Sequence, residues 1–335
     1  MYNYNYIFFN NYDDKFKIDI NKYYTICIQD LYRSPQINIV NYPLDYMPKW
    51  VRYIFGIHNS EKIAKIIKLP FKKLWYPFYF RNRFDDLKPL CFIISQRSLD
   101  LSYLNYLKRK YPSCKIVLIH RDLIKVCKRI APELPFNPVF DLEMTYDQGE
   151  GIKYGLPTFV EFESKIGIVE PTEPESDVFF AGKAKDRLPL LLAAHKVFTD
   201  AGLKVFFFIT GVSAEYRKPL PGIVYSDSPM TYREMLEHTV NARCLLDINQ
   251  EGAVGYTSRF LEAVMYGRRL ITNNPSIRAS KFFSSGYIQI VDKIEEIDPS
   301  FVSDEWKVDY HYNDEFSPFS LIDRIEEELI KKYGE

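Results

Sequence analysis

The residues best suited to binding a ligand lie at 257–262, where a helix start follows a glycine-containing loop. Thr257 and Ser258 are typical helix-capping residues, and Arg259 and Glu262 follow in the first turn. The unpaired N–H groups of a helix start attract a phosphate, and a carboxylate one turn later can accept both hydroxyls of a ribose. This pattern predicts a site for a nucleoside diphosphate. An ion pair between Glu262 and Arg259 is the structural alternative.

The segments around this helix supply the rest of a nucleotide-binding unit. A strand pattern at 243–248 precedes the loop 249–256, and another strand pattern at 269–273 follows the helix. A strand, a glycine loop, a helix and a further strand form the unit that binds phosphates in open α/β sheets. Each signal alone is common, so the prediction rests on their order.

A second set of candidate donor-binding residues follows the apolar strand pattern at 178–181. The set comprises Gly182, Lys183, Lys185 and Arg187. Cations at the end of a strand can offset the charge that develops on a departing nucleoside diphosphate, a task that a metal ion performs in other enzymes. An ordinary solvated loop is the alternative for at least one of them.

The acidic residues give little indication of a metal site. No Asp-x-Asp follows a predicted strand, and the nearest match, Asp141-Leu142-Glu143, lies inside a strand pattern, where a structural role is favoured. We therefore expect chemistry without a metal and without any other cofactor.

These stretches together resemble the C-terminal half of bacterial GT-B glycosyltransferases that assemble lipopolysaccharide, O-antigen or capsule. The resemblance is carried by 177–187, by 246–248, and by Thr257, Arg259, Glu262 and Ala263. A further stretch, 140–147 running into 154–157, is similar to the segment that joins the two domains of these enzymes. The resemblance spans roughly residues 88–290.

The resemblance implies a fold and a domain order. It implies two tandem Rossmann-like domains of the GT-B type, an acceptor-side domain at 1–165 and a nucleotide-sugar donor domain at 166–316. A C-terminal helix within 317–335 would cross back onto the first domain, and packing on its own domain is the equal alternative. Retaining enzymes of this family often carry a second Glu eight residues before Glu262, where this chain has Val254. Retention or inversion of the anomeric configuration therefore stays open.

The hydrophobic pattern by itself also predicts an α/β fold with parallel sheets. In the first half, strand patterns at 90–95, 115–119 and 139–144 alternate with helical patterns at 101–110 and 122–130. Such a β-α-β series folds into a parallel sheet with right-handed crossovers. The second half repeats the alternation.

Capping residues mark two helices of the second half. Asp186 is the expected N-cap of a helix that Gly202 ends, and Thr231 with Glu234 three residues later forms a capping-box pattern. Both predictions concern helices that would cover the donor-domain sheet.

Two residues of the first half are candidates for the general base that deprotonates an acceptor hydroxyl. His120 directly follows the strand pattern at 115–119, at the carboxyl end where open α/β sheets bind ligands. Asp147 follows another strand pattern at a turn on the same edge. Either residue could instead cap a helix, and the sequence does not choose between them.

The resemblance implies transfer of a sugar from a nucleotide-sugar donor to a growing glycan or lipid-linked acceptor. We expect a UDP-sugar, because Ile223-Val224-Tyr225 offers a narrow strand edge suited to a pyrimidine, with Tyr225 as a contact. Lys and Arg together number 44 and so do Asp and Glu, and this balance argues against a duplex-DNA partner. We therefore expect no nucleic-acid partner.

The sequence also bears on location. No apolar run approaches the ~20 residues of a membrane span, and a basic segment followed by an apolar one is missing at the N-terminus. The five cysteines have no CxxC spacing, and four of them lie in or beside apolar runs, as in reduced cytosolic proteins. We expect a cytoplasmic protein, peripheral on the inner face of the cell membrane.

One stretch, 61–83, combines basic and aromatic residues against a single carboxylate, Glu61. Its cations are Lys62, Lys65, Lys68, Lys72, Lys73, Arg81 and Arg83. Basic residues beside aromatic ones suit adsorption to an anionic leaflet. A packed helix and loop with a solvated basic edge is the alternative.

Two other functions are compatible with the same residues. A nucleotide-sugar epimerase uses a nucleotide-diphosphate site on a similar frame but needs no acceptor. A non-catalytic partner subunit with a degenerate pocket is a further alternative, since a fold does not determine a function.

Overall fold

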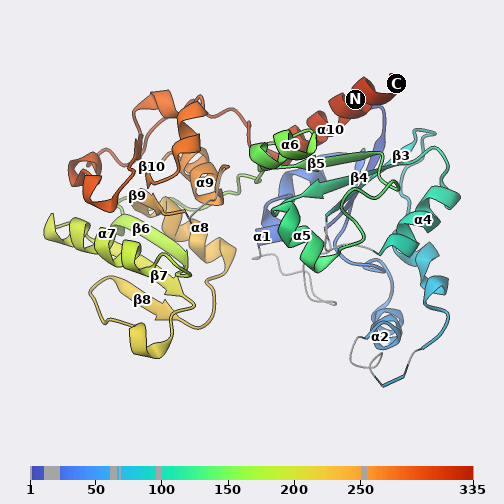
Figure 1. Ribbon diagram of the computed structural model, residues 1–335, viewed down its shortest axis with the longest axis horizontal. Coiled ribbons are helices and arrows are strands. Elements are labelled where there is room, and N and C mark those ends of the chain that lie inside the picture. Colours follow the sequence, from blue (N-terminus) through green and yellow to red (C-terminus); the bar gives the residue numbers. More distant parts are fainter. Residues whose placement is uncertain are drawn as a thin grey trace. The chain divides into compact units, whose positions relative to one another are not determined.

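The computed structural model describes residues 2–10, 23–60, 66–67, 69–95, 100–249 and 255–334. Within these residues the chain divides into two compact units (Figure 1). The N-terminal unit runs to Val160 and includes the C-terminal helix. The C-terminal unit comprises Glu161–Ser317 and the short helix α1 (Tyr23–Ile26).

The N-terminal unit is built on a parallel sheet with the strand order β2-β1-β3-β4-β5, counted over the described residues. The strands are β1 (Asn5–Phe9), β2 (Ile37–Val40), β3 (Leu90–Ser95), β4 (Lys115–His120) and β5 (Leu142–Thr145). The helices are η1 (Gln29–Arg33), α2 (Lys49–His58), η2 (Lys72–Phe78), α4 (Leu101–Lys110), α5 (Ile124–Ile130), α6 (Gln148–Tyr154) and α10 (Pro318–Tyr333). All five residues of β1 are buried, as expected for a strand between two neighbours.

Helix α10 packs on the N-terminal unit. Leu321, Ile325 and Leu329 form its buried stripe. The hydroxyl of Tyr2 donates to Asp323 over 2.8 Å, and the hydroxyl of Tyr6 donates to Glu326. The C-terminal helix therefore crosses back onto the first unit.

The C-terminal unit is built on a second parallel sheet, whose order over the described residues is β11-β10-β9-β6-β7-β8. Its strands are β6 (Ser176–Lys183), β7 (Val205–Thr210), β8 (Ile223–Ser226), β9 (Ala242–Asp247), β10 (Arg269–Thr272) and β11 (Ile288–Ile290). Its helices are α7 (Leu188–Asp200), η3 (Ala214–Tyr216), α8 (Tyr232–Val240), α9 (Ser258–Tyr266), η4 (Pro275–Ala279), η5 (Phe283–Ser285), η6 (Ile294–Glu296) and η7 (Pro299–Phe301).

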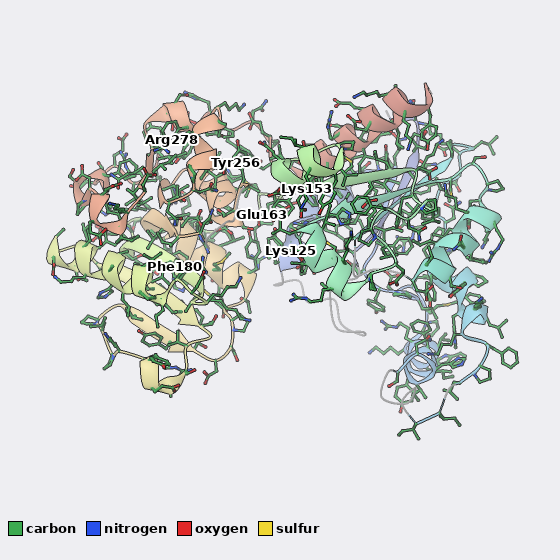
Figure 2. All side chains as sticks on the ribbon, in the orientation of Figure 1. Lys125, Lys153, Glu163, Phe180, Tyr256 and Arg278 are labelled. Carbon is green, nitrogen blue, oxygen red and sulfur yellow. The ribbon has the colours of Figure 1, made fainter. Side chains whose placement is uncertain are left out.

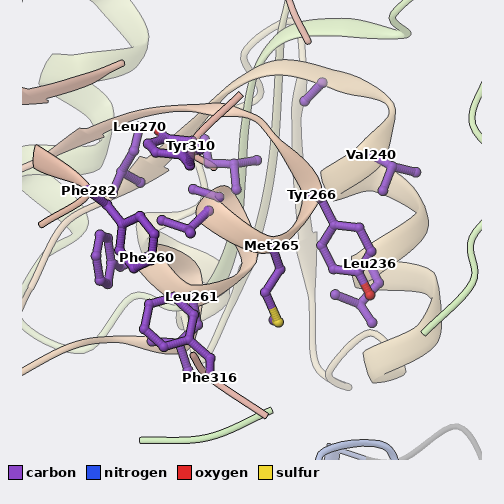
Figure 3. Packing of buried hydrophobic residues seen from close by; sticks show 14 of the residues in the cluster. Leu236, Val240, Phe260, Leu261, Met265, Tyr266, Leu270, Phe282, Tyr310 and Phe316 are labelled. Atoms are coloured by element: carbon purple, nitrogen blue, oxygen red, sulfur yellow. The ribbon is translucent and has the colours of Figure 1, made fainter. Parts of the chain in front are cut away.

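Two apolar clusters cover the faces of this second sheet. Helix α7 packs on one face through Leu191, Ala194 and Phe198. Helices α8 and α9 pack on the other, where Phe260 of α9 lies beside Phe282 and other aromatic side chains (Figure 3). Eight of the nine residues of α9 are buried, so its position relative to the sheet is fixed by packing on all sides.

The observed elements confirm the predicted α/β class with two parallel-sheet units. The capping box of Thr231 and Glu234 is present at the start of α8. The predicted N-cap of α7 was wrong, because the helix begins one residue later, with Arg187 at the cap and no side-chain cap bond. The guanidinium of Arg187 is engaged elsewhere, and Pro189 in the first turn needs no N–H acceptor.

None of the described helices is both long and apolar enough to cross a membrane.

Gly267 ends α9 in a conformation that only glycine adopts without strain. Its φ is 62°, and a Cβ there would lie 2.4 Å from the carbonyl oxygen of Val308. We expect Gly267→Ala to lower the free energy of unfolding by at least ~2 kcal/mol more than Gly286→Ala, measured by urea denaturation.

Gly286 is the matched control. Its φ of 79° carries the same backbone strain, but a Cβ there would have no neighbour within 4 Å. Equal losses in the two variants would mean that the clash with Val308 does not constrain the end of α9.

Candidate nucleotide-binding site

The order of the second sheet creates a crevice at one point of its edge. From β6 the chain continues to β7 and β8 on one side, and later to β9, β10 and β11 on the other. The connections therefore leave the carboxyl ends of β6 and β9 in opposite directions. Ligands of open α/β sheets bind outside the strand ends at such a reversal. We call this point, between β6 and β9, the switch point.

Both predicted sets of donor-binding residues flank the switch point. Gly182 and Lys183 end β6, and Lys185 and Arg187 follow them. Helix α9 follows β9 in the chain, so its first residues belong to the other side of the crevice. Figure 2 labels Phe180 on β6 and Tyr256 just before α9.

The start of α9 is held by a buried carboxylate that the sequence analysis did not select. Asp247, the last residue of β9, accepts hydrogen bonds from the hydroxyls of Thr257 over 2.8 Å and Thr272 over 3.2 Å. The same Thr257 oxygen accepts from the N–H of Phe260 at 3.2 Å and so caps the helix. This leaves the first N–H groups of α9, those of Ser258 and Arg259, without an intrahelical acceptor. A phosphate could accept from both.

Asp247 is buried, and burial raises its pKa, while the Thr257 hydroxyl, Arg259 and Thr272 act in the opposite direction. The sequence did contain a signal for Asp247. A carboxylate that ends an apolar strand directly before the glycine loop is expected to be buried and therefore requires polar partners.

Glu262 takes part in a buried network. Its carboxylate has no exposed surface, accepts from Arg259 over 2.5 Å and accepts from the Tyr232 hydroxyl over 3.0 Å. Burial raises the pKa of Glu262, opposed by the charge of Arg259 and the bond from Tyr232. The ion pair given as the structural alternative is therefore formed. The ribose role stays a prediction, and it requires the carboxylate to leave these partners.

Arg259 is also bound on several sides. Its guanidinium donates to the Ala181 carbonyl on β6 over 3.2 Å and to the Thr239 hydroxyl over 3.3 Å, and it lies 5.5 Å from the Phe179 ring centroid. It thus links α9 to β6 across the sheet face. Because its charge is already paired with Glu262, this guanidinium serves to hold α9 on β6.

The three predicted cations differ in what they can do. Arg187 donates to the carbonyls of Lys183, over 2.5 Å, and Ile248, and so braces the ends of β6 and β9. Burial lowers its pKa. Lys183 and Lys185 are exposed, and Lys185 has a left-handed φ of 47°, which costs about 1 kcal/mol. Backbone strain of this kind is typical of ligand sites. Because both lysines are exposed, they are better candidates than Arg187 for mobile charge neutralisation.

Tyr225 and Ser258 were also predicted to contact the donor. Tyr225 lies farther from the switch point, and the side chain of Ser258 makes one long hydrogen bond. Tyr225 lies on β8, with β7 between it and β6, and its buried hydroxyl has no partner among the described residues. Ser258 at the start of α9 donates to the hydroxyl of Tyr23 over 3.4 Å. The loop residues 250–254, including Glu251 and Val254, lie outside the described residues.

The candidate bases belong to the N-terminal unit. His120 has no exposed surface, and its Nε2 lies 2.6 Å from Glu143 Oε1, while its Nδ1 has no partner among the described residues. The other oxygen of Glu143 accepts from the N–H of Phe136 over 2.9 Å. Asp147 is buried and caps α6 by accepting from the N–H of Glu150 over 2.7 Å. The alternative of a helix cap therefore describes Asp147 in this structure.

Neither base candidate lies at the reversal of the first sheet. That reversal lies between β1 and β3, whose ends are followed by the buried Asn10 and by 96–99. The segments 11–22 and 96–99 lie outside the described residues. His120 ends β4, one strand away from β3, and Asp147 follows β5.

The Asp141-Leu142-Glu143 stretch is occupied by structural bonds. Asp141 accepts from the side chain of Lys108 and from the N–H of Ile116 over 2.6 Å, and Glu143 is paired as described above. Across the described part of the chain, no cluster of His, Cys, Asp and Glu has the arrangement to hold a metal ion.

Similarity to known proteins was found only among solved structures. No family model matches the chain, and no curated protein matches it. T4 phage BGT in complex with its UDP-glucose substrate is 13% identical over 98% of this chain and 96% of that one, with a TM-score of 0.45. An alpha-glucosyltransferase with UDP and DNA is 13% identical over 72% and 76%, with a TM-score of 0.42. TarM is 13% identical over 73% and 52%, with a TM-score of 0.41.

These similar structures belong to glycosyltransferases. At such identities and TM-scores they carry no argument about donor or acceptor. The expectation that nucleic acid is not a partner stays a prediction.

Glu262 can be tested for its two roles in one variant. We expect Glu262→Gln to lower the free energy of unfolding by ~2 kcal/mol, because it leaves the buried Arg259 without an anionic partner. If the carboxylate also binds a ribose, UDP affinity measured by calorimetry should fall by ~1–2 kcal/mol. Glu237→Gln, on the exposed side of α8, is the control.

A loss of stability without any change in UDP affinity would rule out the ribose role. Glu262 would then serve the structure alone.

Proposed function

We propose that this protein is a metal-independent glycosyltransferase that moves a sugar from a nucleotide-diphosphate donor to a glycan acceptor. The proposal rests on one observation. Two segments far apart in the sequence, 182–187 and 257–262, flank the same reversal of a parallel sheet and bring a free helix start and exposed lysines to it. A helix start and mobile cations together suit a diphosphate that leaves as an anion.

In the proposed reaction an acceptor hydroxyl attacks the anomeric carbon of the donor sugar. The bond from that carbon to the diphosphate oxygen breaks, and the nucleoside diphosphate leaves with the electron pair. The first N–H groups of α9 bind the diphosphate, and Lys183 and Lys185 offset the charge that grows on it. The acceptor proton passes to a base of the N-terminal unit.

His120 and Asp147 are both retained as candidates for this base. Glu143 would orient the imidazole of His120 through the Nε2 contact, leaving Nδ1 to accept a proton. Asp147 would have to give up its cap bond to act. These contacts favour His120, provided that the acceptor gains access to it.

The finer parts of the proposal concern donor, acceptor and location. We propose a UDP-sugar as donor, with Tyr225 as a candidate base contact, and a growing surface glycan of the lipopolysaccharide, O-antigen or capsule class as acceptor. Such acceptors are lipid-linked, so the enzyme would work on the cytoplasmic face of the membrane. An epimerase would instead convert the donor sugar into its isomer with no acceptor present, which nuclear magnetic resonance of the donor sugar would detect.

Replacing Lys183 and Lys185 with Gln should lower turnover by ~10-fold or more while changing donor affinity by less than ~3-fold. The reason is that the charge they offset grows in the transition state. The measurement is UDP release from UDP-glucose, with donor affinity determined by calorimetry.

Lys204→Gln is the matched control, because this exposed lysine lies at the amino end of β7, on the opposite edge of the sheet. EDTA should leave the wild type active. Inactivation by EDTA that Mg²⁺ or Mn²⁺ reverses would assign the charge neutralisation to a metal and contradict the role of the lysines.

A further inference from the structure

Helix α2 carries a stripe of large apolar side chains that faces solvent. The stripe consists of Trp50, Tyr53, Ile54 and Ile57, which are 67%, 68%, 47% and 41% exposed. Their spacing of three, four and seven residues puts them on one side of the helix. Helices of globular proteins normally turn such a stripe toward the core.

Other residues of α2 make its contacts with the core. Val51 and Phe55 pack against the apolar cluster of the N-terminal unit, and the Phe55 ring lies 5.4 Å from that of Trp75 and 5.7 Å from that of Tyr79. The helix is therefore apolar on two sides. The contact with the core therefore does not explain why the exposed stripe is apolar.

A hydrogen-bonded chain fixes the neighbouring 3-10 helix to α2. Trp75 Nε1 donates to His58 Nδ1 over 2.8 Å, so the proton of the neutral ring is on Nε2, which donates to the Pro70 carbonyl over 2.7 Å. Phe71 and Leu74 beside this contact are 73% and 71% exposed. The apolar stripe and these two side chains thus belong to one fixed surface, which we call the α2 surface.

The stretch that contains the α2 surface is predominantly basic. Between Lys49 and Arg83 the sequence has nine cations and a single carboxylate, Glu61. The cations are Lys49, Arg52, Lys62, Lys65, Lys68, Lys72, Lys73, Arg81 and Arg83. Residues 61–65 and 68 lie outside the described residues, so only the other six cations belong to the α2 surface.

Exposed apolar side chains gather in the same region. Of the 21 large apolar residues exposed in the described part of the chain, nine lie between Trp50 and Phe78. Apolar side chains rimmed by cations match the two layers of an anionic leaflet, where the acyl boundary lies beneath negative headgroups.

We propose that the α2 surface docks the protein on an anionic lipid leaflet, with α2 lying in the plane of the interface. Trp50 and Tyr53 sit at headgroup level, Ile54 and Ile57 reach the acyl boundary, and the six described cations contact phosphate groups. Figure 1 shows α2 at the periphery of its unit, well apart from α6 and α10. The proposal extends the membrane-face location proposed above, and its test does not depend on sugar transfer.

The test uses the full chain and vesicles of phosphatidylcholine with or without phosphatidylglycerol. We expect co-sedimentation with the anionic vesicles and release as salt rises through the Debye-screening range. Trp50→Ser with Ile54→Ser should weaken vesicle binding by at least ~10-fold. Brominated lipid should quench a tryptophan signal that Trp50→Phe removes.

The matched control is Leu87→Ser with Ile152→Ser, which removes two exposed apolar side chains of the same unit outside the α2 surface. Vesicle binding should persist in this variant, and UDP affinity should be unchanged in both. Equal binding by the Trp50/Ile54 variant and the wild type, or no binding by the wild type, would overturn the proposal. The proposal would also be overturned if the wild type bound no vesicles but formed a dimer in sedimentation, and the Trp50/Ile54 variant were a monomer. The α2 surface would then join two copies of the chain.

Discussion

The reversal of strand order between β6 and β9 is the constraint on which the rest of the candidate site depends. Both strands are parallel and paired, so their carboxyl ends meet at one edge. The chain leaves them in opposite directions, which is the arrangement at which open α/β sheets bind ligands outside the strand ends. Asp247 then fixes the start of α9 at this edge through Thr257. The proposed anion site therefore relies first on backbone N–H groups and only then on side chains.

Buried charge behind the crevice holds this geometry. Arg259 joins Glu262 to the Ala181 carbonyl, and Arg187 joins the ends of β6 and β9. Isolated buried charges would be costly, and their hydrogen bonds and opposite partners offset that cost. These residues are thus engaged in holding the crevice. The exposed Lys183 and Lys185 make no such contacts within the described residues and remain able to follow a ligand.

The donor half of the fold could be predicted from the sequence because its strands are apolar runs and two of its helices, α8 and α9, carry clear capping signals. The Thr257 cap and the Gly267 end of α9 both read directly from residue type. What the sequence could not give was the burial of Glu262, since an intrahelical pair and a ribose contact use the same spacing. Asp247 was missed because its partners, Thr257 and Thr272, come from two different segments.

The N-terminal half was harder to predict. Strand β1 begins with Asn5, whose amide donates to Asp86, and has only four apolar residues after it, which is a short signal for a central strand. Helix α2 has apolar residues on two sides, so its sequence has no single stripe. His120 follows a strand as expected, but only the structure pairs it with Glu143.

The most direct test of the central claim is an amide-resolved nuclear magnetic resonance titration of the protein with UDP and, separately, with uridine. We expect the backbone N–H signals of Ser258 and Arg259 to shift with UDP and not with uridine, because in the proposed site these groups bind the diphosphate. The signals of Lys183 and Lys185 should move with them. Shifts confined to other parts of the chain, or equal shifts with uridine, would contradict a diphosphate site at the switch point.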